Sequence, residues 1–213
     1  MVETDGLRAK TSFLQGSGAA VAAAGVLTVL VNGGFTPLID ADAPFAETAA
    51  SGVFFWRQGF SAVAALLLLL GSVGLHLHQA EYSGRFGSAA FVIAFLGSAL
   101  LLANEWTQLF VMRDLANRVP EVLEALESSD DLSLSDVGAM VAFGVFTLGW
   151  IAFAISMIRA GVYSRKGPIL VIVGFFAVSI LAAVLPDVLG LIIGSVVLGS
   201  GWIVLGRGLH KAV

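Results

Sequence analysis

The chain has 213 residues, of which 58% are hydrophobic and only 12% are charged, and its mean hydropathy is +0.94. A soluble domain carries about twice that charged fraction, so the composition excludes an ordinary soluble core. The formal net charge of −4 and the scarcity of lysine exclude a basic nucleic-acid-binding surface. The chain has no cysteine, which excludes disulfides and thiolate ligands, and its three histidines argue against a transition-metal centre.

Long apolar runs recur along the chain, each close to the roughly 20 residues that a helix needs to cross a bilayer. Backbone groups in lipid must be hydrogen-bonded within the segment, and no run alternates as a barrel strand would. The sequence therefore predicts an all-α, polytopic membrane bundle that forms one domain over residues 1–213. We expect about six transmembrane helices, at about 13–35, 53–77, 87–109, 137–158, 168–186 and 188–206. The first run is long for a signal peptide, so we expect a retained helix.

Lysine and arginine favour the cytoplasmic side of short loops. If the N-terminus is inside, eight of these residues lie in cytoplasmic segments: Arg8, Lys10, Arg85, Arg159, Arg165, Lys166, Arg207 and Lys211. Only Arg57, Arg113 and Arg118 then lie outside. This bias predicts an N-in, C-in topology.

The longest predicted outer loop has structure of its own. Apolar residues recur there at spacings of three and four with charges between them, which predicts an outer amphipathic helix at about 110–127, bent near Pro120. Such a helix lies on the membrane surface or caps the bundle, and a lid over an outward-facing cavity is the alternative. Ser133 and Asp136 are a predicted capping box for the next span.

Two predicted cytoplasmic turns have similar sequences. A shift of 80 residues superimposes identical residues, namely Ala80 on Ala160, Arg85 on Arg165 and Gly87 on Gly167. One interpretation is a parallel repeat, in which the hairpin of spans two and three corresponds to the hairpin of spans four and five. The alternative is shared turn chemistry, since arginine and glycine are favoured in any cytoplasmic turn.

Small residues predict close helix contacts in the first and last spans. They are Gly16, Ala20 and Ala24 in the first and Gly190, Gly194, Ser195, Gly199 and Gly201 in the last. The pattern leaves open whether the contacts lie within the bundle or between protomers. The four tryptophans lie near turns, which favours anchoring at the membrane interface; they are Trp56, Trp106, Trp150 and Trp202.

Several short motifs carry a family resemblance. They are Arg57-Gln58 at the start of span two, the turn from Gln79 to Gly87, the segment from Trp106 to Val111, and Gly149-Trp150 in a helix that ends at Arg159 to Val162. Together they resemble a loose set of small, multi-span, uncharacterised prokaryotic membrane proteins. The resemblance implies the architecture and a prokaryotic membrane, and it implies no activity.

Ionisable residues within a span are functional candidates because they are costly in lipid. Four spans have none between their ends, which argues against ion-coupled transport. The exceptions are Arg57 and Glu105, at the outer ends of spans two and three. One hypothesis is that these two residues pair and line an outward-facing ligand-binding pocket together with Trp56, Gln58, Asn104, Trp106 and Gln108. The alternative is an ion pair that pins two helices beside ordinary interfacial tryptophans.

The sequence contains no nucleophile–base pair, phosphate-binding loop or paired catalytic carboxylates, and it predicts no metal site. An enzyme is therefore the minority interpretation, and the cofactor is left unknown. The preferred interpretation is a multi-pass protein of a prokaryotic plasma membrane. It would be a structural or accessory subunit, or a binder of an apolar ligand such as a lipid, quinone or pigment. A small-molecule transporter or channel is the alternative. Its partners would be the lipid bilayer, an apolar ligand, and a second copy or another membrane subunit.

Overall fold

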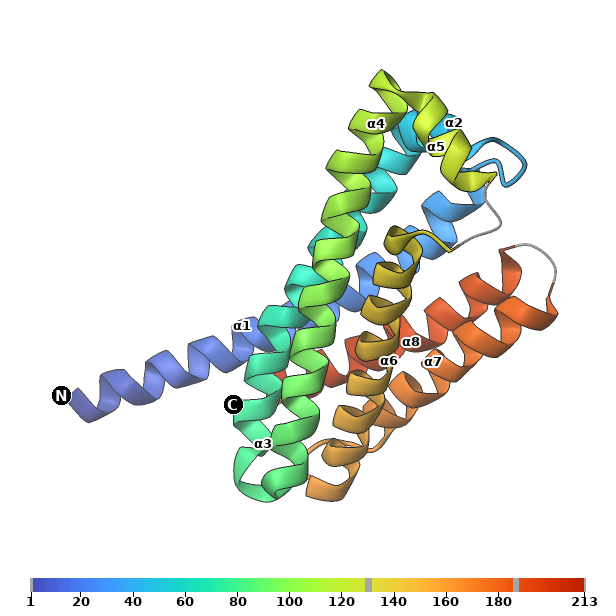
Figure 1. Cartoon of the computed structure of the whole chain (residues 1–213). Coiled ribbons are helices and arrows are strands. Elements are labelled where there is room, and N and C mark those ends of the chain that lie inside the picture. Colours follow the sequence, from blue (N-terminus) through green and yellow to red (C-terminus); the bar gives the residue numbers. More distant parts are fainter. Residues whose placement is uncertain (1, 129–131, 186–187, 213) are drawn as a thin grey trace.

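The computed structural model describes residues 2–128, 132–185 and 188–212, and in these ranges the chain is helical with no strand. Figure 1 shows the helices in chain order. They are α1 (Val2–Leu30), the π-helix η1 (Val31–Phe35), the 3₁₀-helix η2 (Thr36–Leu38), α2 (Phe45–Ala50), α3 (Gly52–Trp106), the π-helix η3 (Thr107–Met112), α4 (Arg113–Arg118), α5 (Pro120–Glu127), α6 (Leu134–Ala160), α7 (Lys166–Val184) and α8 (Leu189–Lys211).

Five helical segments of the described chain are long and apolar enough to cross a membrane. Their bounds are Arg8–Leu38, Gly52–Arg118, Leu134–Ala160, Lys166–Val184 and Leu189–Lys211. The prediction of an all-α bundle is thus confirmed, and five of its segments have the length and apolar composition of membrane spans. The count differs from the expected six because the second segment contains both the predicted second and third spans.

The second of these segments is bent at one glycine. Gly84, within α3, has φ 57° and ψ −160°, a backbone conformation that is open to glycine and strained for other residues. Figure 1 shows the two halves of α3 lying side by side on either side of this bend. Helix continues on both sides up to Gly84, so the turn expected between residues 77 and 87 is a sharp bend at this non-helical glycine and not a longer loop.

The remaining predicted elements correspond to observed helices with small differences in their ends. The predicted span 168–186 corresponds to α7, and its last residue, with Asp187, lies outside the described residues, as do residues 129–131 of the outer loop. The predicted outer helix is divided, because Val119 leaves the helical region (φ −145°, ψ 59°). Proline disfavours helical dihedrals in the residue before it, so the bend falls at Val119 and α5 begins at Pro120. The Ser133–Asp136 capping box is confirmed.

The long helices pack as two groups joined by α1. α3 contacts α6 extensively, and α7 contacts α8 extensively, whereas α1 contacts both α3 and α8. Between the two groups, α6 and α7 have far fewer contacts. In Figure 1, α6 and the α7–α8 hairpin diverge from the short turn that connects α6 to α7.

Glycines make the close contacts of α8 within the bundle. A Cβ on Gly194 would meet the backbone nitrogen of Val178 on α7 at 2.5 Å, and a Cβ on Gly199 would meet the carbonyl oxygen of Gly25 on α1 at 2.5 Å. The small residues of the last span therefore face two neighbouring helices of the same chain. On the first span the glycines in contact with α8 are Gly18 and Gly25 and not Gly16, whose added Cβ would have nothing within 4 Å.

The centre of the bundle is aromatic. Trp150 and Trp202 are 0% and 1% exposed, and their rings meet nearly edge to face at 5.6 Å between centroids. The Trp150 Nε1 donates a hydrogen bond to Ser98 Oγ on α3 at 3.0 Å. The expectation that all four tryptophans anchor the interface is wrong for these two, because aromatic neighbours on several helices bury their rings; Trp56 and Trp106 are 57% and 59% exposed and remain consistent with it.

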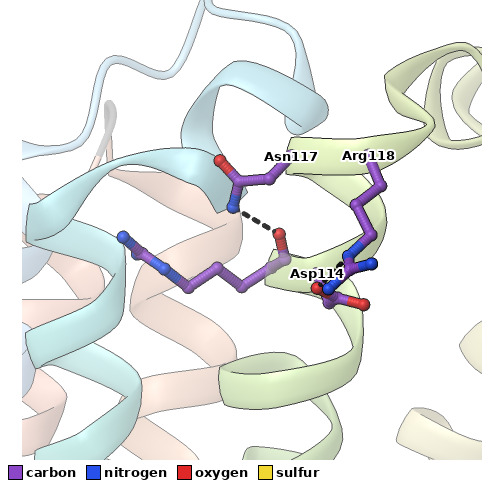
Figure 2. A network of polar contacts seen from close by, with 4 residues as sticks. Asp114, Asn117 and Arg118 are labelled. Carbon is purple, nitrogen blue, oxygen red and sulfur yellow. Dashed lines mark hydrogen bonds and ion pairs between the residues drawn. The ribbon is translucent and has the colours of Figure 1, made fainter.

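A smaller apolar cluster covers the end of the bundle at which α2, α4 and α5 lie. Its buried members are Ala46, Ala49, Phe54, Ala116 and Leu123. Two polar contacts join the short helices to their neighbours: the backbone N–H of Phe45 on α2 donates to Glu127 Oε2 on α5 at 3.1 Å, and Arg113 Nη1 on α4 donates to the carbonyl oxygen of Ser51 at 2.7 Å. Within α4, Asp114 and Arg118 form an ion pair at 2.7 Å and the Asn117 amide donates to the carbonyl oxygen of the residue at position 113 (Figure 2). The three short helices therefore pack together as a cap over this end of the bundle.

Candidate functional site

A cavity of about 220 Å³ lies where the two helix groups meet. Its walls come from α1, α3, α6, α7 and α8, so it is assembled from residues far apart in the sequence. Most of the lining is apolar, with aromatic rings of Phe146, Phe175 and Trp202 from the core cluster. The polar residues of the lining are Thr28, Asn32, Arg57, Ser61, Glu105, Thr147, Ser179 and Ser195.

Arg57 reaches the cavity from the start of α3, five residues after Gly52 and so about 8 Å along the helix axis. Its Nε donates to Thr36 Oγ1 at 3.0 Å, and its Nη1 donates to Gln58 Oε1. The Thr36 hydroxyl donates in turn to the carbonyl oxygen of Val31 at 3.1 Å. These bonds fix the guanidinium against the end of α1, because η1 and η2 carry Thr36 to that position.

Glu105 lines the same cavity from the other half of α3. Its side chain is 6% exposed, and its Oε2 has no hydrogen-bond partner in the described part of the chain. Electrostatic attraction connects Glu105 to Arg57, yet no described contact between them is within the 4.0 Å of an ion pair. Arg57 and Glu105 therefore line the same cavity without forming the predicted ion pair.

Trp202 supplies a second unpaired polar atom. It lines the cavity from α8, and its indole Nε1 is buried without a partner among the described residues. Buried polar atoms are nearly always hydrogen-bonded, and one left unpaired costs about 1–3 kcal/mol. Glu105 and Trp202 thus both line the cavity, and each has one buried polar atom without a hydrogen-bond partner among the described residues.

The other predicted site residues do not line this cavity. Gln58 is 4% exposed and supports Arg57 through its Oε1. Gln108 instead lines a second cavity of about 310 Å³, whose wall includes residues of α2 and α5. Asn104 is half-buried and lines neither cavity, and Trp56 and Trp106 are exposed and line neither, because successive side chains on a helix point in different directions.

Two π-helices flank the charged end of the cavity. η1 follows directly after the α1 residues that line it, and η3 begins two residues after Glu105. A π-turn inserts an extra residue into a helix and is frequent at functional sites. The insertion changes the direction of the side chains that follow, which is how Thr36 comes to accept from Arg57.

Sequence reasoning missed the other hydroxyl and amide side chains that line this cavity. Thr28 and Ser179 donate to carbonyl oxygens of their own helices, Ala24 O at 2.9 Å and Phe175 O at 3.1 Å. Their oxygens keep accepting capacity toward the cavity. The available signal was the occurrence of single polar residues in otherwise apolar runs, such as Thr28 and Asn32 near the end of the first span.

The charges in the cavity balance, since it contains one guanidinium and one carboxylate. No group of three or more His, Asp or Glu side chains that could hold a metal ion occurs among the described residues. The arrangement can bind a neutral molecule by hydrogen bonds at a charged end and by apolar contact along the rest of the wall.

No protein-family model, curated protein or solved structure matched the chain. The resemblance to multi-span prokaryotic proteins therefore stays a prediction, and the class supported by the structure is a bundle of apolar, membrane-spanning helices with an internal cavity.

Proposed function

We propose that this protein is a six-span plasma-membrane protein of a prokaryote, with both termini in the cytoplasm, that binds a neutral amphipathic molecule in the cavity between its helix groups. The observation that carries the proposal is the pair of unpartnered polar atoms, Glu105 Oε2 and Trp202 Nε1, at a largely apolar cavity. The two halves of α3, lying side by side about Gly84, would count as separate spans and give the sixth.

The charge balance supports a neutral ligand. Arg57 alone would favour a phosphate or carboxylate, but the buried Glu105 beside it repels an anion, and Arg57 likewise repels a cation. A head group with both a hydroxyl and a carbonyl would satisfy the acceptor on Glu105 and the donor on Trp202. A quinone and its quinol are such molecules, and their apolar rings suit the aromatic wall.

The cavity size supports a small head group. Pockets for drug-sized ligands have roughly 300–1,000 Å³, so a cavity of about 220 Å³ accommodates a ring or head group and not an entire lipid. We therefore take the quinone head as the member of this class to test first.

The test is a titration of decylbenzoquinone and its quinol against protein in lipid nanodiscs, with native mass spectrometry of the protein as purified. Glu105→Gln preserves size and removes the charge, so it should raise the Kd of the quinol at least tenfold, which is about 1.4 kcal/mol. The matched control is Glu124→Gln on the exposed face of α5, which should bind as wild type does.

Absence of a bound molecule after purification, together with no saturable binding by the wild-type protein, would overturn this ligand class and favour the structural or accessory role. If wild type and Glu105→Gln bound the quinol with equal Kd, the cavity would not be the binding site, and any quinone would bind elsewhere on the protein.

The sparse contact between α6 and α7 favours a transporter as the second candidate. Two rigid helix groups with a binding cavity between them could rock about their shared end and expose the cavity to either side. Proteoliposome flux of the bound molecule would support this alternative, and binding without flux would support the first.

A further inference from the structure

The cavity reaches the molecular surface between α6 and α7. Phe143 on α6 lines the cavity and is also 50% exposed, and Ser179 on α7 lines it and is exposed as well. Thr147 and Val178 lie on the same two helices and complete this opening, which we call the α6–α7 seam (Phe143, Thr147, Val178 and Ser179).

The distribution of glycines explains why the seam stays open. Gly149 of α6 allows contact with the backbone of Ala94 on α3, and Gly174 of α7 allows contact with Leu198 on α8. By contrast, Gly138 and Gly144, the other glycines of α6, have nothing within 4 Å of an added Cβ. Close approach of backbones thus holds each helix in its own group. Among the described residues no glycine makes such a contact between α6 and α7, which meet instead through the rings of Phe146 and Phe175 at 5.6 Å between centroids.

The seam lies at the depth of the hydrocarbon. Phe143 is nine residues from the start of α6, about 14 Å along the axis, and Ser179 is five residues before the end of α7, about 8 Å. The hydrocarbon core is about 30 Å thick, and α6 with 27 residues is longer than that. The opening therefore faces lipid tails and not water.

We propose that the ligand enters and leaves sideways, from the bilayer through the α6–α7 seam, and that its tail stays in the lipid while its head occupies the cavity. This inference rests on the proposed function and restricts the ligand to molecules already dissolved in the membrane. The small cavity volume is consistent with it, because only the head has to fit.

A thiol placed in the cavity tests the route without any ligand, because the chain has no cysteine of its own. Ser195→Cys introduces a thiol at a wall residue that is 1% exposed, and the protein is reconstituted in lipid vesicles. N-phenylmaleimide, which partitions into lipid, should label it at least tenfold faster than a sulfonated maleimide. Adding Ser179→Phe should slow that labelling at least tenfold, whereas Ile180→Phe, which is exposed on the same helix but lines no cavity, should leave it unchanged.

Faster labelling by the sulfonated reagent, or labelling that Ser179→Phe does not affect, would overturn the lateral route. Failure of both reagents to label Ser195→Cys would also overturn the lateral route, provided that Ser61→Cys on the α3 wall is unlabelled as well. The second variant is needed because the Ser195 variant alone could be misfolded. Because no quinone is used, success here with failed quinone titrations would reject the proposed ligand and keep the route.

Discussion

At the scale of the residue, some buried polar side chains donate to helix backbone carbonyl oxygens and others line the cavity. Tyr163, in the turn between α6 and α7, shows the first case, since it is 7% exposed and its hydroxyl donates to the carbonyl oxygen of Leu75 at 2.8 Å. Burial raises the pKa of the Tyr163 phenol well above its ordinary value of about 10. The folded protein therefore keeps this phenol neutral at pH values that ionise it in the unfolded chain.

A dependence of stability on alkaline pH follows from this shift. Above about pH 10 the unfolded state loses the Tyr163 proton and the folded state keeps it, so the free energy of unfolding falls by up to about 1.4 kcal/mol per pH unit from this group. Below that pH the group contributes no slope. Tyr163→Phe should lose about 1 kcal/mol at neutral pH with the hydrogen bond, and its unfolding free energy should fall less steeply above pH 10.

The measurement is chemical unfolding in detergent across a pH series, compared with Tyr82→Phe, which alters a tyrosine that is 66% exposed. If the Tyr163 and Tyr82 variants had the same alkaline slope, burial of Tyr163 would have no role in it.

At the scale of the element, the glycines of α8 determine which helices can be neighbours. Gly199 meets Gly25 of α1, and Gly194 meets Val178 of α7, so α8 presents small surfaces on two sides. In lipid, close packing of this kind is a main source of helix association. The hydrophobic effect does not drive helices together there, because lipid tails are as apolar as the helix surface.

Gly199→Ala should therefore lower stability by about 1–3 kcal/mol, since the added methyl overlaps the carbonyl oxygen of Gly25 and forces α1 and α8 apart. Gly208→Ala is the control on the same helix, because nothing lies within 4 Å of its added Cβ and alanine favours a helix by about 1 kcal/mol. Thermal unfolding in one detergent should rank Gly208→Ala at or above wild type and Gly199→Ala below it. The reverse order would contradict the contact.

Much of the element structure could be predicted because lipid imposes a length and an apolar composition on every span. The division of the predicted outer helix near Pro120 and the capping box at Ser133 could also be predicted, because both depend only on residues close together in the sequence. The sharpness of the turn at Gly84 could not, because residues 77–87 carry the charges and glycines of a longer loop. Local composition does not reveal that one glycine with positive φ joins the two helices.

At the scale of the whole molecule, the sequence could identify Arg57 and Glu105 as unusual but not the cavity that they share with α6, α7 and α8. Their equal depth follows from topology alone, whereas Ser179 and Ser195 join them only through contacts between distant helices. Trp202 illustrates the same limit, since its position near a chain end suggests an interface anchor until the neighbouring rings are placed around it. The shift that aligns the two similar turns places Gly84 opposite Ser164 and not opposite the positive-φ Gly161. The turns therefore differ in backbone conformation, and a duplication stays a prediction.

The proposed topology makes a prediction for three single-cysteine variants of this cysteine-free chain. An impermeant maleimide applied to intact cells should label Glu124→Cys, and should label Glu81→Cys and Lys211→Cys only after permeabilisation. All three side chains are exposed, so access is decided by the side of the membrane. Labelling of Glu81→Cys from outside would contradict the six-span arrangement about Gly84.

The contact between α1 and α8 also has a consequence for biosynthesis. Gly18 of α1 lies against Gly206 of α8, so α1 meets this partner only after α3, α6 and α7 have been synthesised. Until the C-terminal segment is inserted, the small-residue face of α1 has no α8 backbone to meet and faces lipid or an insertion factor. A prematurely terminated chain would expose that face permanently, which gives membrane quality control a defined surface by which to distinguish unfinished copies from finished ones.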